Sequence, residues 1–333
     1  MEISELDGER LLFAVPKKGR LHQRCLQLLE GADIQFHRKN RLDIATSTNL
    51  PLTLVFLPAA DIAKFVGNGN VDLGITGEDM IAEVAGGSAH GKITTVQELG
   101  FGTCRLSLQA PAADVERRRA RKAAAGAAGA DAAVTPRDFV GCRVATSFVH
   151  LATKYFGAME AGATAPAAAP PAATGAGSTR IEYVGGSVEA ACGLGLADAV
   201  VDLVESGETM RAAGLVEVGT LMATQAVLVA NRAKLASDGP RRALVDMIVR
   251  RIRGVLAAAR YVLINYNMRR DQLAEARRIT PGRKAPTVST LEDPEWIAVS
   301  AMILKKDAAT IMDQLEAVGA RDILVFEIHN CRE

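Results

Sequence analysis

A short polar loop at residues 205–209 carries the residues best suited to hold a phosphate group. It follows a run of apolar β-formers at 199–204 and precedes a helix-competent segment. A strand, a Gly/Ser/Thr loop and a helix N-terminus together point several backbone N–H groups, and the positive end of a helix dipole, at one small volume. Ser206 and Thr209 would add hydroxyl donors, and Gly207 would let the backbone approach a ligand closely. An ordinary capped strand-to-helix turn explains the same pattern when the loop is considered alone.

Cations gather directly after the first apolar strand candidate. Residues 16–20 read Pro-Lys-Lys-Gly-Arg and place three cations, Lys17 and Arg20 among them, at a helix N-terminus. Each cation there opposes the helix dipole at a cost of up to about 1 kcal/mol, and a bound polyanion would remove that conflict. A solvated basic turn is the alternative. Arg41 belongs to a second basic segment that precedes the next strand.

Two further strand ends carry glycines. The segment 71–79 (VDLGITGED) contains Gly74, Thr76 and Gly77, and its glycines permit close approach of a ligand. The segment 184–189 (VGGSVE) ends a strand with a glycine pair, a serine and a carboxylate. Strand ends of this kind, distributed over two α/β units, suggest a cleft that holds a phosphorylated ligand, because α/β sheets bind ligands at the carboxyl ends of their strands. Neither a GxGxxG fingerprint nor a P-loop is present.

The composition limits the classes of function. The 333-residue chain is 49% apolar, 23% charged and 4% aromatic, with a net charge of +1. It has neither the global positive field nor the aromatic platforms expected of a nucleic-acid binder. The first residues are acidic and unlike a signal peptide, and no apolar run is long enough to cross a membrane. Five scattered cysteines without a CxxC pair, and five histidines without ligand spacing, indicate a reducing cytoplasm and no metal site formed by the protein alone.

Strand and helix patterns alternate through the front of the chain. In a first α/β unit we expect strands and helices in turn at 11–15, 21–29, 52–57, 58–66, 71–76 and 79–84. In a second we expect strands at 104–108, 143–146, 181–184 and 199–204, with a later one at 223–230. This alternation predicts mainly parallel sheets covered by helices. The Ala-rich stretches 116–133 and 161–177 lack bulky apolar residues and are predicted to be surface insertions.

A β-α-β-β-α-β pattern closes the chain. A long amphipathic helix is predicted at 241–261, and strands and helices follow at 262–266, 271–279, 287–291, 297–304, 307–318 and 323–328. This order is the ferredoxin-like arrangement, and an appended domain of this type usually has a regulatory or assembly role.

Seven segments, in order along most of the chain, resemble the motifs of ATP phosphoribosyltransferase, the first enzyme of histidine biosynthesis. They are VPKKGRL (15–21), RKNRLDI (38–44), VDLGITGED (71–79), FGTCRLSL (101–108), RVATSF (143–148), GGSVEAA (185–191) and GLADAVVDLVESGETMRAAGL (195–215). The C-terminal pattern resembles the regulatory domain of the family's long form. The resemblance implies transfer of phosphoribosyl from 5-phosphoribosyl 1-diphosphate to N1 of ATP, with loss of diphosphate and inversion at the anomeric carbon.

The resemblance also implies an architecture. It is an α/β protein with two periplasmic-binding-protein-like α/β domains that form a cleft, plus a C-terminal ferredoxin-like (ACT-like) α+β regulatory domain. We expect a discontinuous first domain at 1–103 and 205–235 and a second domain at 104–204 that carries both Ala-rich insertions. A linker helix and the regulatory domain would occupy 236–333.

The implied substrates give the candidate residues their roles. Lys17 and Arg20 would neutralise the leaving diphosphate together with Mg²⁺, which would bind through the substrates rather than through a protein site. Asp202 and Glu189 would suit the ribose hydroxyls and the positive charge that develops at the anomeric carbon. The remaining substrate-binding candidates come from the phosphate loop, the 71–79 segment and the second basic segment: Glu205, Ser206, Gly207, Glu208, Thr209, Gly74, Thr76, Gly77 and Arg41.

Glu205 and Glu208 depart from the Ser/Thr-rich loops of many family members. Two carboxylates beside a phosphate would repel it unless they point outward and the ligand binds the backbone. No residue is identified as a general base, and positioning with electrostatics could supply much of the rate.

The long form of the family binds L-histidine as a feedback inhibitor and forms a hexamer in exchange with active dimers. Asn265, Thr287 and Ser289 are therefore candidates to contact histidine, although ordinary edge or turn positions explain these polar residues equally well. The expected partners are ATP, phosphoribosyl diphosphate, histidine and further copies of the chain, without nucleic acid or membrane. The alternatives are a two-domain solute-binding protein and an effector-sensing regulator. The acidic N-terminus and the lack of a DNA-binding motif weigh against them.

Overall fold

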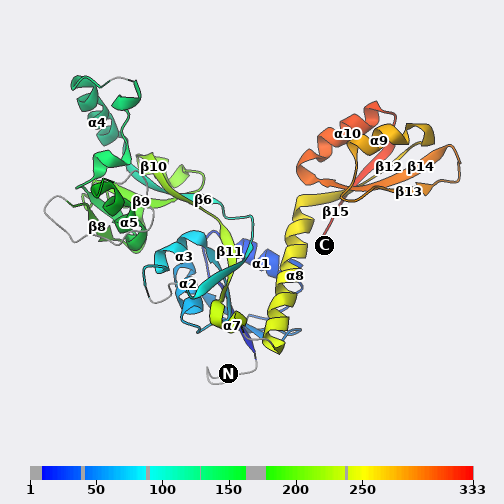
Figure 1. Cartoon of the computed structure of the whole chain (residues 1–333), viewed down its shortest axis with the longest axis horizontal. Helices are drawn as coiled ribbons and strands as arrows, with labels where there is room; N and C mark the ends of the chain where they lie inside the picture. The colour runs from blue at the N-terminus through cyan, green and yellow to red at the C-terminus, as the bar shows by residue number, and fades with distance from the viewer. Residues whose placement is uncertain are drawn as a thin grey trace. The chain divides into compact units, whose positions relative to one another are not determined.

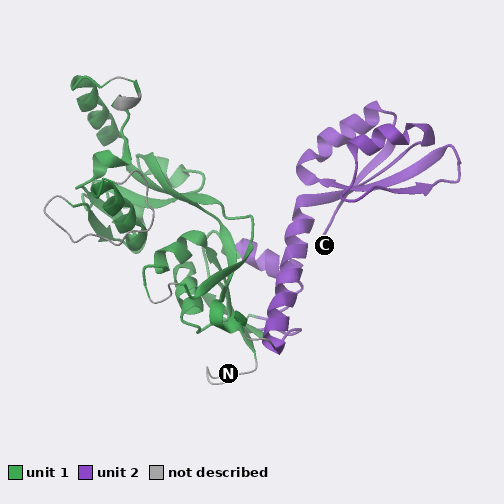
Figure 2. Ribbon diagram, in the orientation of Figure 1, with its two compact units in different colours: residues 1–22, 38–45, 52–237 green, residues 23–37, 46–51, 238–333 purple. Residues whose placement is uncertain are grey.

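The chain folds into two compact units, which Figure 2 distinguishes by colour. The computed structural model describes residues 10–38, 42–87, 91–127, 129–162, 178–236 and 239–332. The first unit comprises residues 1–22, 38–45 and 52–237, and the second comprises 23–37, 46–51 and 238–333. The first unit contains two sheets, which we call, with their helices, the first and second lobes (Figure 1).

The first lobe is built on a six-stranded mixed sheet of order β2-β3-β1-β4-β11-β5. Its strands are β1 (Leu11–Pro16), β2 (Ile44–Thr46), β3 (Leu52–Leu57), β4 (Leu73–Gly77), β5 (Ile93–Glu98) and β11 (Ala226–Asn231). Its helices are α2 (Ala59–Gly67), α3 (Glu78–Val84) and α7 (Arg232–Ala236). β1 runs parallel to β3 and β4, whereas β11 is antiparallel to β4 and β5. Ile62 and Val66 of α2 pack with Val227 and Val229 in the core of this lobe.

The second lobe is built on a five-stranded mixed sheet of order β10-β6-β9-β7-β8. Its strands are β6 (Cys104–Pro111), β7 (Arg143–Thr146), β8 (Arg180–Tyr183), β9 (Ala199–Val204) and β10 (Leu215–Thr224). Its helices are α4 (Ala112–Ala124), η2 (Gly129–Ala132), η3 (Pro136–Phe139), α5 (Val149–Glu160), η4 (Val188–Ala190) and α6 (Glu208–Ala212). Leu106, Leu108, Phe139, Phe156 and Val201 are among its core residues, and each is fully buried.

The second unit contains a four-stranded antiparallel sheet of order β13-β14-β12-β15. Its elements are α1 (His22–Gly31), α8 (Pro240–Arg260), β12 (Tyr261–Arg269), η5 (Arg270–Gln272), α9 (Leu273–Ile279), β13 (Thr287–Thr290), β14 (Trp296–Leu304), η6 (Lys305–Asp307), α10 (Ala308–Ala317) and β15 (Arg321–Glu327). Alternate residues of β12 (Val262, Ile264, Tyr266 and Met268) are buried in a core shared with α9 and α10, as the two-residue period of a strand requires.

The sheets are mixed rather than mainly parallel. Two strands, β5 and β10, fall where no strand was expected. A single residue, Gln225, separates β10 in the second lobe from β11 in the first. The chain therefore re-enters the first sheet beside the carboxyl end of β4, with Ala226 opposite Gly77, and β11 must run antiparallel to β4.

The return to the first lobe comes later than the sequence suggested. Because β10 pairs with β6, residues 215–224 belong to the second sheet, whereas we expected 205–235 to lie in the first domain. In the first Ala-rich stretch, α4 forms a helix with no buried residue, in agreement with a surface position. Most of the second stretch, 163–177, lies outside the described residues.

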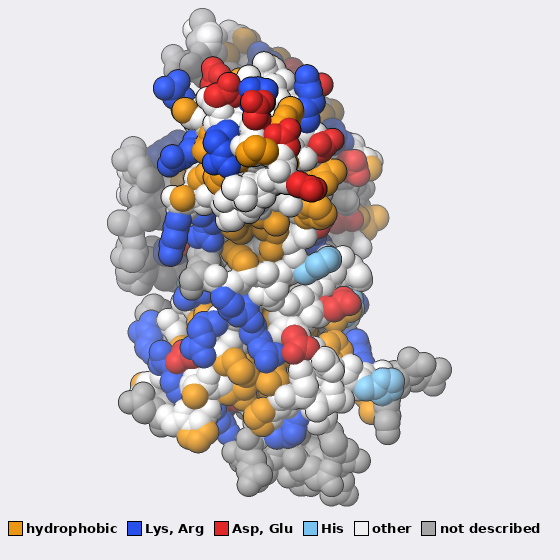
Figure 3. Space-filling model, turned by 90° about the vertical axis from the view of Figure 1, so that its right-hand side faces the viewer, with side chains coloured by type: hydrophobic (Ala, Val, Ile, Leu, Met, Phe, Trp, Pro, Cys, Tyr) orange, Lys and Arg blue, Asp and Glu red, His pale blue; other side chains and the backbone are white. Residues whose placement is uncertain are grey.

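The net charge of +1 gives the chain no strong overall field of a single sign. On the face drawn in Figure 3, acidic, basic and apolar side chains are interspersed over its upper part, in keeping with the net charge of +1. Anion binding must therefore rest on local groups. In the part of the chain that the structure describes, no helix is long and apolar enough to cross a membrane.

Candidate active site

Two crossings connect the lobes, and the candidate residues Arg20 and Glu205 lie near the first of them. One crossing connects β5 to β6 through residues 99–103, and the other is Gln225 between β10 and β11. Lys17 and Arg20 follow the carboxyl end of β1 in the first lobe, and residues 205–209 follow the carboxyl end of β9 in the second. The carboxyl ends of strands are where α/β sheets bind ligands.

Arg20 binds the first crossing. Its Nη1 donates to the carbonyl oxygen of Gly102 at 2.5 Å, and its guanidinium also hydrogen-bonds the Cys104 thiol. Burial raises the pKa of Cys104, the nearby Arg20 lowers it, and the charges of Asp79 and Glu205 raise it further. Arg20 and Glu205 therefore both act on the Cys104 thiol, although they are far apart in the sequence.

Lys17 is held by a carboxylate that the sequence did not point to. Its Nζ lies 2.7 Å from Oδ2 of Asp43, and Arg38 Nη2 lies 3.3 Å from Oδ1 of the same residue. The hydrogen bond from Lys17 lowers the pKa of Asp43, with smaller contributions from the charges of Lys17 and Arg38. Arg38 also stacks over the ring of Phe56 at 3.9 Å, which fixes its guanidinium. Arg41 lies outside the described residues.

The loop at 205–209 has the backbone of a helix start. Gly207 is the N-cap of α6 and has φ of +76°, a left-handed conformation that favours glycine. Glu205, Ser206, Glu208 and Thr209 are all exposed, so the two carboxylates do not fill a buried pocket. The first N–H groups of α6 have no partners within the helix, and a ligand could therefore bind them.

Arg211 is a cation beside this loop that sequence reasoning missed. Its Nη2 donates to the carbonyl oxygen of Ser206 at 3.1 Å, and an added Cβ on Gly207 would lie 2.8 Å from its Nη1. The guanidinium therefore covers Gly207. The only sequence signal was its place four residues after the glycine, on the first turns of a helix.

Asp202 and Glu189 also come together. Burial raises the pKa of Asp202, the charge of Glu189 raises it further, and the N–H of Leu203, which donates to Oδ1 at 2.8 Å, lowers it. Glu189 lies in η4, which begins after Ser187 with φ of +48°. A half-buried pair of neighbouring carboxylates is suited to hydroxyl donors or to a developing positive charge.

A polar network occupies the same face of the second sheet as Asp202. Ser107 lies directly opposite Asp202 in the β6–β9 pair. Ser107 Oγ donates to Glu217 Oε1 at 2.7 Å, and Arg105 Nη2 lies 2.5 Å from Glu217 Oε2. The hydrogen bond from Arg105, assisted by those from Ser107 and Thr220, lowers the pKa of Glu217 to about 2. Glu217 is therefore a permanent anion that joins β6 to β10.

Gly74, Thr76 and Gly77 are buried, and the fold itself accounts for them. A Cβ on Gly74 would lie 2.6 Å from Ile62, so the glycine lets α2 approach the sheet. Thr76 Oγ1 donates to the carbonyl oxygen of Ala59 at 3.2 Å. A Cβ on Gly77 would overlap the Asp79 carboxylate. Their close approach is to protein atoms, and a substrate role for them stays a prediction.

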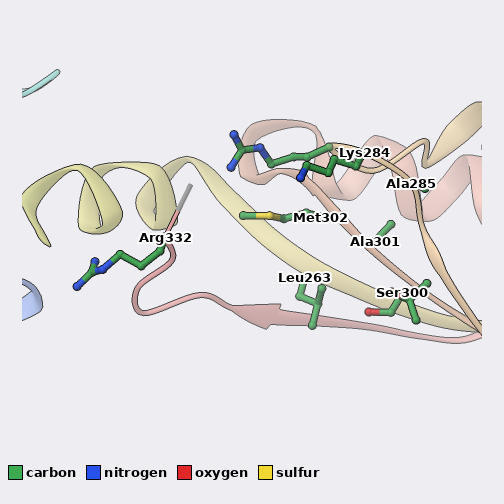
Figure 4. A pocket seen from close by; sticks show the side chains of 9 residues that line it. Leu263, Lys284, Ala285, Ser300, Ala301, Met302 and Arg332 are labelled. Carbon is green, nitrogen blue, oxygen red and sulfur yellow. The ribbon is translucent and has the colours of Figure 1, made fainter. Parts of the chain in front are cut away.

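The second unit has a pocket of about 480 Å³ on its sheet (Figure 4). Its charged lining residues are Arg283, Lys284 and Arg332, and none of the described residues that line it is acidic. Of the three candidates for effector binding, Thr287 lines the pocket, opposite Ser300 of β14.

Asn265 and Ser289 do not line this pocket. Asn265 lies opposite Ser300, which is one of the lining residues. The Asn265 Oδ1 atom is buried and has no hydrogen-bond partner within the part of the chain that is described. Such an atom is costly unless a ligand or a water satisfies it. Ser289 lies opposite Ala298, two positions further along β13.

Comparison with known proteins gives one family over nearly the whole chain. The family model "ATP phosphoribosyltransferase" matches residues 58–254, and "HisG, C-terminal domain" matches 258–330. A protein named ATP phosphoribosyltransferase from Eremothecium gossypii is 48% identical over 334 residues, which is 100% of both chains. Proteins of the same name from Yarrowia lipolytica and Saccharomyces cerevisiae are 49% and 46% identical, and each alignment covers 97% or more of either chain.

A solved structure agrees in fold. The "ATP phosphoribosyl transferase (HisG:HisZ) complex from Thermotoga maritima" has a TM-score of 0.53 and 20% identity, and covers 73% of this chain and 96% of that one. Full-length identity near 48%, two adjoining family models and a shared α/β fold lead to one conclusion. The chain is a member of the ATP phosphoribosyltransferase family, in its long form.

Proposed function

We propose that the chain transfers the phosphoribosyl group of 5-phosphoribosyl 1-diphosphate to N1 of ATP, the first step of histidine biosynthesis. The observation that carries the proposal is 48% identity, over the full length of both chains, to a protein named ATP phosphoribosyltransferase. The geometry agrees with the proposal, because Lys17 and Arg20 follow a strand end in the first lobe and the 205–209 loop follows a strand end in the second.

The reaction forms one bond and breaks one. The lone pair of adenine N1 attacks the anomeric carbon, and the bond from that carbon to the diphosphate oxygen breaks, so that the diphosphate leaves with the electron pair. Positive charge develops on the sugar ring while negative charge accumulates on the leaving group. Catalysis then depends on fixed groups that stabilise both charges and on alignment of the two substrates.

In this proposal the two lobes hold opposite ends of the sugar phosphate. The backbone of residues 205–209 binds the 5-phosphate, and Arg211 adds a cation beside it. Lys17 and Arg20 face the diphosphate, with Arg41 as a further candidate. Lys17 would exchange Asp43 for the more highly charged diphosphate. Exchange of one anionic partner for another is less costly than desolvation of a free ammonium group.

Asp202 and Glu189 act on the ribose. Their carboxylates would accept hydrogen bonds from its hydroxyls and stabilise the charge at the anomeric carbon. Mg²⁺ supplies a Lewis acid that neutralises the diphosphate, and Mg²⁺ commonly binds through phosphates and few protein ligands. Among the described residues, no group of three or more His, Cys, Asp or Glu could hold a metal ion. The two carboxylates fit as additional oxygen ligands, because a nearby cation would offset both the burial and the charge of Glu189, which raise the pKa of Asp202.

The finer architecture is part of the same proposal. The two lobes correspond to periplasmic-binding-protein-like domains around a cleft. The sheet of the second unit has the strand order β15-β12-β14-β13, with α9 between β12 and β13 and α10 between β14 and β15. This arrangement supports a ferredoxin-like regulatory domain. We also propose that the enzyme works in the cytoplasm as a homo-oligomer, where its five free cysteines stay reduced.

We assign feedback inhibition by L-histidine to the second unit. The cations of the pocket suit the histidine carboxylate, and Thr287 and Ser300 add hydroxyls. Figure 4 shows Lys284 above the sheet from which Ser300 and Met302 project. The buried Oδ1 of Asn265 could accept an N–H of the ligand if the neighbouring strand residues shift. Ser289 is a more distant candidate on β13.

Diphosphate release and the ultraviolet change of N1-substituted adenine test the proposal. The purified protein is mixed with ATP, phosphoribosyl diphosphate and Mg²⁺, and turnover is expected only when all three are present. Binding of both substrates without turnover would favour a solute-binding protein instead. Addition of L-histidine should lower the rate, and a rate independent of histidine would refute the regulatory assignment alone.

A further inference from the structure

The helix α3 of the first lobe packs into both lobes. Ile81 packs against the first-lobe core around Ile62, whereas its neighbour Met80 packs against the second-lobe core that contains Phe148. This seven-residue helix thus presents one apolar side chain to each lobe, and its position is fixed by both cores.

Hydrogen bonds fix the start of α3 to the second crossing. Asp79 is 2% exposed, and its Oδ1 accepts the hydroxyl of Thr224, the last residue of β10, at 2.7 Å. The Asp79 N–H is 3.1 Å from the same Thr224 oxygen, and the N–H of Glu78 donates to Gln225 O at 3.1 Å. The point at which the chain passes between the lobes is therefore held by α3.

Glu83 supplies the N-terminal cap that α5 lacks. The N-cap position of α5 is Phe148, which has no side-chain acceptor. Glu83 Oε1 accepts the N–H of His150 at 2.8 Å, and Oε2 accepts that of Leu151 at 3.0 Å. A carboxylate here satisfies two otherwise unpaired N–H groups and interacts favourably with the helix dipole. A single side chain of the first lobe thus holds the first turn of the principal helix of the second lobe.

The segment after α3 fits against the same helix. A Cβ added to Gly86 would overlap the imidazole of His150, so only glycine allows this contact. The next residue, Gly87, has room for a Cβ, with its nearest neighbour at 3.6 Å. The two glycines therefore form a matched pair for mutation.

We infer that α3, through Glu83, sets the orientation of the lobes that the reaction requires. This inference rests on the proposed function, in which Lys17 and Arg20 of one lobe and residues 205–209 of the other hold the same substrate. Rotation of one lobe would move the cations away from the leaving diphosphate while the 5-phosphate stays bound. Glu83 is a positioning residue, because it acts through the lobe orientation and not on the substrate.

Steady-state kinetics of full-length variants test this role. In Glu83→Ala, kcat/KM should fall about 100-fold, with KM for both substrates raised and kcat lowered, since misplacement by about 1 Å has effects of that size. Glu83→Gln should be intermediate, because its amide has only one acceptor oxygen. Glu116→Gln removes an exposed carboxylate on α4 and should stay within about twofold of the parent. If Glu83 had a purely structural role, the Glu83→Ala variant would have a smaller active fraction and unchanged KM values. That result would overturn the inference.

The glycine pair provides a second test if Glu83→Ala does not fold. Gly86→Ala should raise both KM values as Glu83→Ala does, whereas Gly87→Ala should not. Equal kinetics for the two glycine variants would contradict the inference.

Hydrogen exchange gives a readout that does not depend on turnover. The amides of His150 and Leu151 should exchange about tenfold faster in Glu83→Gln than in the parent. Added phosphoribosyl diphosphate should slow exchange at residues 99–103 in both proteins, but less in the variant than in the parent. If the parent chain shows no turnover, the proposed function fails, while this measurement still tests whether Glu83 of α3 holds the start of α5. Unchanged exchange at His150 and Leu151 would overturn the inference.

Discussion

Lys17 follows the carboxyl end of β1 in the first lobe and is one member of an ion pair. Its partner Asp43 is itself shared with Arg38, so three charges are arranged before any substrate arrives. The side chains of Lys17 and Asp43 are both nearly half exposed, and pairs of this kind contribute little to stability. In the proposed function the arrangement serves to position Lys17, because Asp43 would hold the ammonium group where a diphosphate could replace it.

Replacement of Lys17 should impair catalysis far more than stability. For Lys17→Ala we expect kcat/KM to fall by about 100-fold or more, since a group that stabilises charge in the transition state has effects of that size. The control is Lys64→Ala, which removes an exposed lysine from α2 of the same lobe. Lys234 would not serve, because its Nζ lies 2.9 Å from the buried Asp72 carboxylate. Equal activity in the two variants would remove Lys17 from the site.

Asp202 should determine part of the pH dependence. Burial and Glu189 raise its pKa, so Asp202 takes up a proton at a higher pH than an ordinary aspartate. We expect kcat/KM to fall on the acid side as this carboxylate is neutralised. Asp202→Asn should lower kcat about 100-fold and abolish that acid limb. An identical acid limb in the variant would show that another group titrates.

At the scale of elements, glycines and ion pairs determine how the sheets pack. Gly74 allows α2 to lie against β4, and Arg105 with Glu217 joins β6 to β10. Both features are contacts between protein atoms. Both determine whether the strand ends that carry the site residues stay in register.

Gly74→Ala tests whether this glycine serves packing or ligand approach. Its Cβ would lie 2.6 Å from Ile62 and 2.9 Å from Val66, and overpacking of this kind destabilises by about 1–3 kcal/mol. The KM values of the folded fraction should not change. Gly157→Ala, in α5 with no atom within 4 Å, should be neutral or stabilising. A large rise in KM with normal stability would instead support a substrate contact at Gly74.

Glu217 should stabilise the second lobe in a pH-dependent way. Its pKa falls from an ordinary 4.5 to about 2, so the stabilisation is complete above about pH 4.5 and is lost as the pH falls through about 2. Glu217→Gln should lower the free energy of unfolding at pH 7 by about 1–2 kcal/mol. Urea unfolding of both proteins at pH 7 and pH 3 measures the difference, which should be smaller at pH 3. A difference independent of pH would contradict the assigned role of the charge.

Local signals allowed most elements, and the strand ends that carry the candidate site residues, to be predicted from the sequence. Apolar runs such as 52–57 and 199–204 mark strands, and Gly207, shortly after the second run, marks a strand-to-helix turn. The strand β10 escaped prediction because its polar and glycine residues have no clean alternation. The interaction partners could not be predicted, because they lie far apart in the sequence. The separation is 26 residues for Lys17 and Asp43, 67 for Glu83 and His150, and 112 for Arg105 and Glu217.

At the scale of the whole molecule, the proposed function assigns chemistry to the first unit and regulation to the second. The first unit carries the cations, the phosphate loop and the carboxylate pair, and the second carries a basic pocket on an antiparallel sheet. The family model for the transferase and the model for the C-terminal domain meet between residues 254 and 258, at the end of α8. A change confined to the pocket, such as Lys284→Ala, should therefore abolish inhibition by histidine and leave turnover intact.

The bond formed in the product tests the central claim most directly. The protein is incubated with Mg²⁺, ATP carrying ¹⁵N at N1 and phosphoribosyl diphosphate carrying ¹³C at the anomeric carbon. The account predicts a one-bond ¹³C–¹⁵N coupling in the product and one diphosphate released for each coupled product. Coupling to a different nitrogen, release of free ribose 5-phosphate, or recovery of both substrates unchanged would contradict it.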